Sequence, residues 1–138
     1  MKNVIFFTHA EKKPSGGAKY IYNYSQIINE IKNFTSEVVH IKKKRTSKFR
    51  DSINKKLNFK RDVHSGWQFE DITYSKNFKY KWFDNKVKIK QNFNFDKKKD
   101  FIILPEIFAH IADELFIKNK IHYAIFVQNG YVINSTDD

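Results

Sequence analysis

Residues 3–41, NVIFFTHAEKKPSGGAKYIYNYSQIINEIKNFTSEVVHI, hold the pattern that decides the fold. NVIFFTH (3–9) is a short apolar run, typical of a strand buried on both faces of a parallel sheet. From Ala18, apolar residues recur at positions 18, 21, 24, 28 and 31, with Tyr20 and Ile27 widening this helical stripe. EVVHI (37–41) then predicts a second strand. This order predicts a βαβ unit with a right-handed crossover.

The carboxyl-terminal part of the chain repeats this order. DFIILPE (100–106) predicts a strand that ends at Pro105, a residue suited to the first turn of a helix. The helix that follows has one apolar face: Ile107, Phe108, Ile111, Leu115 and Phe116. HYAIFVQ (122–128) predicts a further buried strand. Two such units predict an α/β fold, a Rossmann-like parallel sheet flanked by helices, as one domain over residues 1–138.

The middle of the chain, residues 43–99, predicts a basic, aromatic-rich and irregular segment. KVKIK (86–90) alternates like a strand with one polar face. Aromatic residues concentrate between Trp67 and Phe83. We expect them to pack an irregular or hairpin segment onto the sheet; the alternative is a platform on which bases or sugars stack.

The net charge of +11 is concentrated in two windows. Residues 42–61 carry ten Lys and Arg and one Asp, and residues 76–99 carry nine Lys and two Asp. A compositional bias toward Lys with a solvated face explains this charge, and so does contact with an anionic membrane surface. Nucleic acid is disfavoured because only three of the 26 basic residues are Arg, the side chain best suited to reading bases.

Cysteine is absent, which excludes a disulfide framework and thiolate sites and fits a reducing compartment. The longest apolar runs have four residues, too short for a membrane span or the apolar region of a signal peptide. We therefore expect a cytoplasmic protein, with peripheral contact at the inner membrane face as a further expectation.

The Gly16-Gly17 pair lies between the first strand and the first helix. Such a pair lets the backbone approach a ligand closely and exposes amides at the positive end of the helix dipole. The chain lacks both G-x-G-x-x-G and a Gly-Lys-Ser/Thr phosphate loop. A ligand-facing loop and a plain turn therefore both remain open.

Three segments carry a family resemblance: PSGGAKYIYNYSQIINEI (14–31), DFIILPEIF (100–108) and IFVQNGY (125–131). Together they resemble the amino-terminal half of bacterial GT-B glycosyltransferases of the family 4 type. The resemblance implies that this domain mainly holds the acceptor, a glycan or a lipid-linked sugar, while a second domain holds a nucleotide-sugar. It also implies that Gly16 and Gly17 approach the donor diphosphate. No other cofactor is implied, because the nucleotide-sugar is a co-substrate.

Open α/β sheets bind ligands at the carboxyl ends of their strands. That edge is expected to present five side chains: Thr8, His9, Glu106, Gln128 and Asn129. His9 or Glu106 is the candidate base toward an acceptor hydroxyl; the alternatives are a loop histidine and a carboxylate that stabilises its own helix dipole. The Gln128 and Asn129 amides suit hydroxyl recognition. The remaining histidines lack ligand-like spacing, so no metal site is proposed.

The family's donor-binding half does not fit within 138 residues. We therefore expect an enzyme half that is inactive alone and is completed by a second domain. Ser135-Thr136-Asp137-Asp138 has the pattern of a helix start, or else of a polar tail. The alternative function is a non-catalytic basic α/β module that binds an anionic polymer or a membrane surface.

Overall fold

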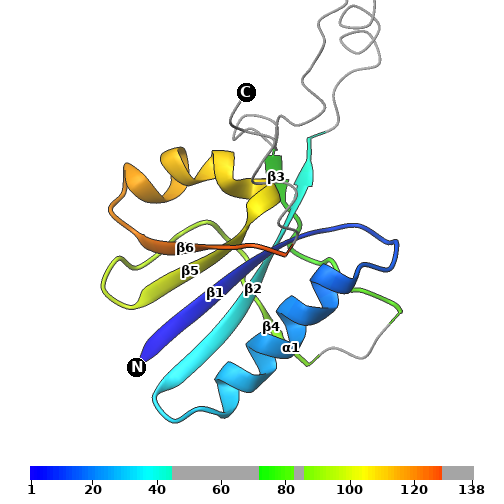
Figure 1. The fold of residues 1–138 in the computed structure, drawn as a ribbon, viewed down its shortest axis with the longest axis horizontal. Helices are drawn as coiled ribbons and strands as arrows, with labels where there is room; N and C mark the ends of the chain where they lie inside the picture. The colour runs from blue at the N-terminus through cyan, green and yellow to red at the C-terminus, as the bar shows by residue number, and fades with distance from the viewer. Residues whose placement is uncertain (45–71, 83–85, 129–138) are drawn as a thin grey trace, which may run out of the picture.

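A computed structural model describes residues 1–44, 72–82 and 86–128 (Figure 1). The element order is β1 (Lys2–His9), α1 (Gly16–Glu30), β2 (Phe34–Lys43), β3 (Ile72–Tyr74), β4 (Lys88–Ile89), β5 (Asp100–Pro105), η2 (Glu106–Ile111), η3 (Asp113–Ile117) and β6 (His122–Phe126). The strands form one mixed sheet in the order β3-β2-β1-β5-β6, with β4 also paired to β2. All pairs are parallel except β2 with β3.

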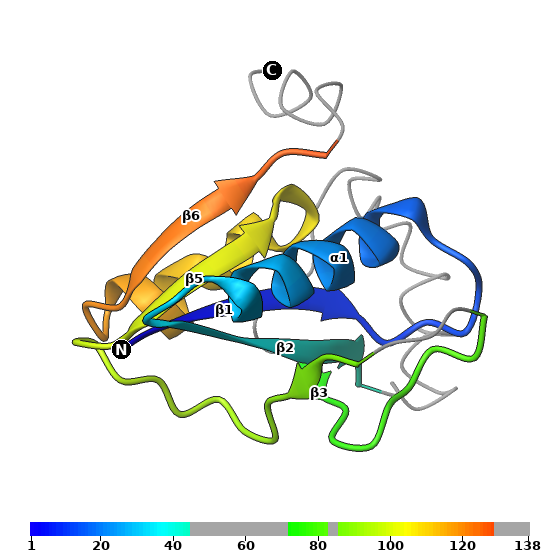
Figure 2. The same ribbon diagram turned by 90° about the horizontal axis from the view of Figure 1, so that it is seen from below.

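Strand β1 lies in the middle of this sheet and alternates its side chains between two apolar layers. Ile5 and Phe7 point into the layer that η2 and η3 cover. Val4 and Phe6 point into the layer that α1 covers. Figures 1 and 2 show the central strand with its helical segments around it. This arrangement is an α/β fold of mostly parallel strands flanked by helices, compatible with a Rossmann-like fold.

The chain that follows β5 is helical, but it is not an ordinary α-helix. η2 is a 3₁₀ helix whose N-cap is Pro105, and η3 is a single π-helical turn. The predicted apolar face is mostly correct, since Phe108, Ile111, Leu115 and Phe116 are buried. Ile107 is 38% exposed, so its assignment to that face is wrong.

Helix α1 buries a face that agrees only in part with the one that its apolar spacing predicts, because Ala18 and Ile21 are buried and Ile28 packs against the core. Its buried residues are Ala18, Ile21, Tyr22 and Ser25, whereas Tyr24 and Ile31 are exposed. The hydroxyls explain this rotation: Ser25 Oγ donates to Ser36 Oγ at 2.8 Å, and the Tyr22 hydroxyl bonds His40 Nε2. Polar partners on β2 thus decide which side of α1 faces the sheet.

The middle segment is described in part. Phe78 and Tyr80 pack in the layer beneath α1, which agrees with the expected packing of the aromatic stretch. The predicted strand at 86–90 is present but short, as β4. Residues 45–71 and 83–85, including Trp67 and Phe83, lie outside the described residues, and so does the predicted helix start at 135–138.

Candidate functional site

The order of the strands along the sheet reverses at β1, so the carboxyl end of β1 is the switch point of the sheet. β2 lies on one side of β1 and β5 on the other. The helical segments after β1 and β5 pack on opposite faces. Open α/β sheets bind ligands in the crevice at such a point. The residues that follow β1 and β5 therefore form the candidate site.

Three of the predicted site residues are joined by hydrogen bonds at this edge. The backbone N–H of Gln128 donates to Glu106 Oε2 at 3.1 Å. The Gln128 side chain donates from Nε2 to the carbonyl oxygen of Gly17, also at 3.1 Å. Gln128 thereby links the start of η2 to the first turn of α1, across 111 residues of sequence from Gly17.

The two glycines begin α1 rather than forming a turn ahead of it. Ser15 is the N-cap, and its Oγ accepts from the N–H of Ala18 at 3.4 Å. Neither glycine has a positive φ. A Cβ at Gly17 would lie 2.5 Å from Gln128 Oε1, whereas a Cβ at Gly16 would meet nothing within 4 Å. The close approach of Gln128 therefore explains why residue 17 is a glycine. No contact requires a glycine at position 16.

His9 is held by partners from the neighbouring loops. Its Nε2 lies 3.9 Å from Glu11 Oε2, and its carbonyl oxygen accepts a hydrogen bond from the Tyr80 hydroxyl. The side chain is 17% exposed, so a ligand at the carboxyl edge could still reach it. Asn129, the other amide predicted here, lies outside the described residues.

A buried polar cluster beneath α1 lies next to His9, and the sequence did not indicate it. Thr8 and His40 are register partners in β1 and β2. The Thr8 hydroxyl is 3.4 Å from the Tyr80 hydroxyl. The Tyr22 hydroxyl bonds His40 Nε2, while His40 Nδ1 is buried without a hydrogen-bond partner in the described part of the chain. Thr8 was expected to be presented at the ligand edge, but its side chain is buried in this cluster instead.

Burial shifts the proton equilibria of this cluster. It lowers the pKa of His40 to about 4, and the neighbouring His9 adds to the effect. Burial also raises the pKa of Tyr80 to about 12 and that of Tyr22 beyond its usual range. His40 is therefore neutral and both phenols are protonated at neutral pH.

A basic pocket of about 620 Å³ opens beside the carboxyl end of β2. Its polar lining consists of Lys12, Lys42, Lys43, Lys44, Thr73 and Ser75. No Asp or Glu of the described residues lines it. Four like charges raise the local positive potential, which favours an anionic ligand. The basic sequence window 42–61 indicated the positive charge of this pocket. It did not indicate that Lys12 also lines the pocket.

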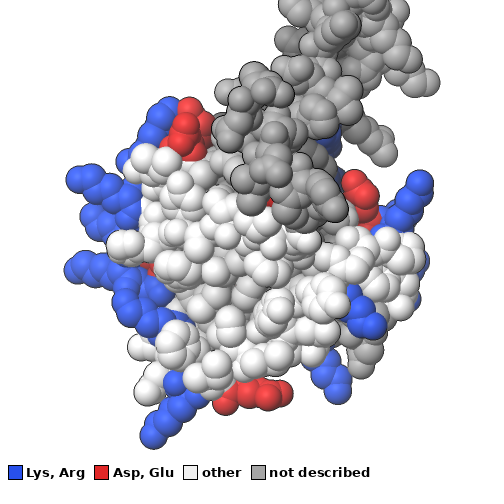
Figure 3. Space-filling model, viewed as in Figure 1, with Lys and Arg blue, Asp and Glu red and all other residues white. Residues whose placement is uncertain are grey.

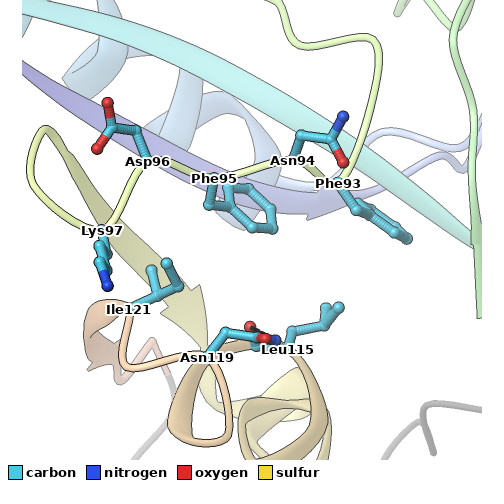
Figure 4. Close-up of a pocket in the computed structure, with 8 residues that line it drawn as sticks. All are labelled: Phe93, Asn94, Phe95, Asp96, Lys97, Leu115, Asn119 and Ile121. Atoms are coloured by element: carbon cyan, nitrogen blue, oxygen red, sulfur yellow. Dashed lines mark hydrogen bonds between the residues drawn. The ribbon is translucent and has the colours of Figure 1, made fainter.

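A second pocket, of about 600 Å³, lies at the amino ends of β5 and β6 (Figure 4). Phe93 and Phe95 point toward Leu115 across it, while Asp96 points away. The Asp96 carboxylate accepts from the N–H of Lys98, and the Asn119 amide donates to backbone carbonyls. Because these polar groups do not converge on the pocket, it is not the candidate site.

No group of His, Asp and Glu side chains in the described part of the chain could hold a metal ion. No helix among the described elements is long and apolar enough to cross a membrane.

No protein-family model, curated protein or solved structure matches the chain.

Gly17→Ala tests the close approach of Gln128. The added Cβ would displace the Gln128 side chain, which is flexible, so we expect the Gln128 side-chain amide resonances to shift. The melting temperature should not fall, because Ala is a better helix former than Gly by up to about 1 kcal/mol. Gly16→Ala is the matched control and should leave Gln128 unchanged. Identical Gln128 spectra in both variants would contradict this account.

His40 predicts a loss of stability in acid. Its pKa is about 4 in the folded chain and about 6.5 when unfolded, so below pH 6.5 the unfolded state binds a proton that the folded state excludes. The contribution of neutral His40 to the free energy of unfolding is fully present above pH 6.5 and is lost as the pH falls toward 4.

Urea unfolding at pH 7.5 and pH 4.5 measures this loss. Between these two pH values, the decrease in the free energy of unfolding should be about 2 to 3 kcal/mol smaller in His40→Gln than in the wild type. Replacing the exposed His122 with Gln controls for the loss of a histidine. An equal acid loss in His40→Gln and wild type would show that His40 is not the group responsible.

Proposed function

We propose that this chain is the acceptor-side, Rossmann-like domain of a GT-B type glycosyltransferase. In the complete enzyme, sugar would pass from a nucleotide-sugar held by a second domain to a glycan or lipid-linked acceptor. The observation that carries the proposal is the hydrogen-bonded series Gly17, Gln128 and Glu106 at the carboxyl edge beside β1. These three residues come from the three segments on which the family resemblance depends.

The chemistry of this series suits a sugar hydroxyl. The Glu106 carboxylate accepts a hydrogen bond from the Gln128 N–H, and a carboxylate is a hydrogen-bond acceptor that suits a sugar hydroxyl. Glu106 would therefore orient an acceptor hydroxyl or take its proton, at a distance of about 2.6–3.2 Å. The Gln128 amide would bind a neighbouring hydroxyl, and His9 is the alternative base.

The start of α1 would face the donor. The first amides of a helix have no partners inside the helix, and they lie at the positive end of its dipole. Gly16 is exposed and a Cβ there would meet nothing within 4 Å, so the backbone at Gly16 is open to approach, whereas Gln128 lies against Gly17. A diphosphate presented by a second domain would meet these amides in the complete enzyme.

Acceptor binding tests the proposal. Titration of the ¹⁵N-labelled chain with lactose, maltose and chitobiose should shift the amide resonances of Gly17, Glu106 and Gln128. Glu106→Gln should weaken binding about tenfold, since hydrogen bonds to a charged group contribute about 1.5–3 kcal/mol. The matched control is Glu114→Gln, a surface carboxylate paired with Lys118. If both variants bind alike, Glu106 is not an acceptor ligand.

Binding and turnover of a nucleotide-sugar distinguish a half-enzyme from a complete enzyme. UDP-glucose alone should bind weakly and should not be turned over, because donor binding is assigned to the second domain. Release of UDP by this chain alone would overturn the half-enzyme proposal.

The basic pocket favours a second candidate function, a non-catalytic module for an anionic polymer. Four lysines and two hydroxyls line one pocket, and this composition suits phosphate or sulfate groups. This candidate requires no second domain.

Removing positive charge from the basic pocket tests the second candidate function. Lys42→Gln with Lys44→Gln should weaken binding to a labelled polyphosphate at least tenfold and should reduce its salt dependence. The control with the same change in charge is Lys98→Gln with Lys99→Gln, at the amino end of β5. Equal weakening by the two pairs would indicate attraction by net charge alone.

A further inference from the structure

Helix α1 leaves an apolar stripe outside the core. Tyr20, Tyr24, Ile27 and Ile31 are 61%, 43%, 53% and 49% exposed. Their spacing of four, three and four residues places them on one side of the helix. Tyr24 also contacts the Phe126 ring edge to face, so the stripe lies on the flank of α1 that faces β6. The other flank, with Lys19, Asn23 and Glu30, is polar.

The stripe continues onto the sheet beyond the end of α1. Phe34 at the start of β2 and Phe101 in β5 are 42% and 39% exposed. Together with Val4 they line a pocket of about 250 Å³ at the amino edge of the sheet. We call the combined surface the α1 apolar face; it consists of Tyr20, Tyr24, Ile27, Ile31, Phe34 and Phe101. Contiguous exposed apolar surface of this kind marks an interaction site.

Lysines border this face at its amino-edge end. Lys2, Lys98 and Lys99 line the same small pocket as Phe34 and Phe101. Figure 3 shows a broad uncharged surface bordered by many Lys and Arg side chains and fewer Asp and Glu side chains. The acidic residue lining the pocket, Asp100, is 8% exposed and accepts hydrogen bonds from Asn3 and the N–H of Asp96. The pocket rim is therefore cationic.

The charge of the rim decides between two occupants. A second copy of the chain would bring together two molecules that each carry a net charge of +11, which repel one another. An anionic bilayer would instead place lipid phosphates against the lysines of the rim. Tyr and Ile side chains also suit the boundary between headgroups and acyl chains.

We propose that the α1 apolar face docks on an anionic phospholipid bilayer, with α1 along the surface and Lys2, Lys98 and Lys99 among the headgroups. The small pocket beside these lysines would accept part of an acyl chain. This proposal is independent of sugar transfer, because it uses none of Gly17, Glu106 and Gln128. It assigns membrane contact to this face rather than to the lysines of the basic pocket.

Vesicle flotation tests the proposal with the full chain. Vesicles of phosphatidylcholine and phosphatidylglycerol in equal amounts should bind the protein at about 0.15 M salt, and vesicles of phosphatidylcholine alone should bind it far more weakly. Lys98→Gln with Lys99→Gln should weaken binding about 30-fold, since each lysine near an anionic surface contributes about fivefold. Lys42→Gln with Lys44→Gln should change it little.

A separate pair of substitutions tests the contribution of the apolar side chains to vesicle binding. Tyr20→Gln with Ile27→Gln should weaken vesicle binding at least tenfold, because both side chains would leave an apolar environment. Asn23→Ala with Gln26→Ala, on the polar flank of α1, is the control. All four positions lie outside the core, and thermal unfolding confirms that each variant folds.

Three outcomes would overturn the proposal. Equal binding of the wild type to both kinds of vesicle would remove the role of the lysines. Equal weakening by the two lysine pairs would show attraction without a preferred face. Concentration-dependent dimers that Tyr20→Gln with Ile27→Gln abolishes, without vesicle binding, would assign the face to a second copy. Loss of saccharide binding would bear only on the proposed function.

Discussion

The burial of β1 between two apolar layers is the constraint on which the other elements depend. Because β1 carries apolar side chains on both faces, it requires a layer on each side and a parallel partner on each edge. Asn3 fixes that pairing at its amino end. Its side chain donates to Glu37 in β2 and to Asp100 in β5, and accepts from Thr35, so one residue ties three strands in register.

The same constraint creates the candidate site. With β2 and β5 on opposite edges of β1, the segments after β1 and β5 separate toward opposite faces and leave polar groups at the edge between them. Gln128 closes this gap from the end of β6 by bonding both Gly17 and Glu106. The site is thus a consequence of strand order, and its residues need not be neighbours in the sequence.

Strand positions could be predicted because apolar runs bounded by polar residues depend on local sequence alone. The predicted strand at 3–9 corresponds to β1, and that at 122–128 to β6, with differences only at their ends. The buried face of α1 was predicted only in part: Ala18 and Ile21 are buried as expected, but Tyr22 and Ser25 are held by hydroxyl contacts with β2, which hydropathy does not encode. The approach of Gln128 to Gly17 spans 111 residues, so no local pattern could indicate it.

The two basic clusters lie at opposite ends of the strands, and this separation allows them to act independently. Lys2 begins β1, while Lys42 lies just beyond Ile41, the register partner of His9 at the other end of β1. The seven residue steps from one end of β1 to the other span about 23 Å at about 3.3 Å per residue. That distance is about three Debye lengths at physiological ionic strength, where the Debye length is about 8 Å. An anion in the basic pocket would therefore barely change the potential at the amino edge, and a bilayer there would leave the pocket and the candidate site open.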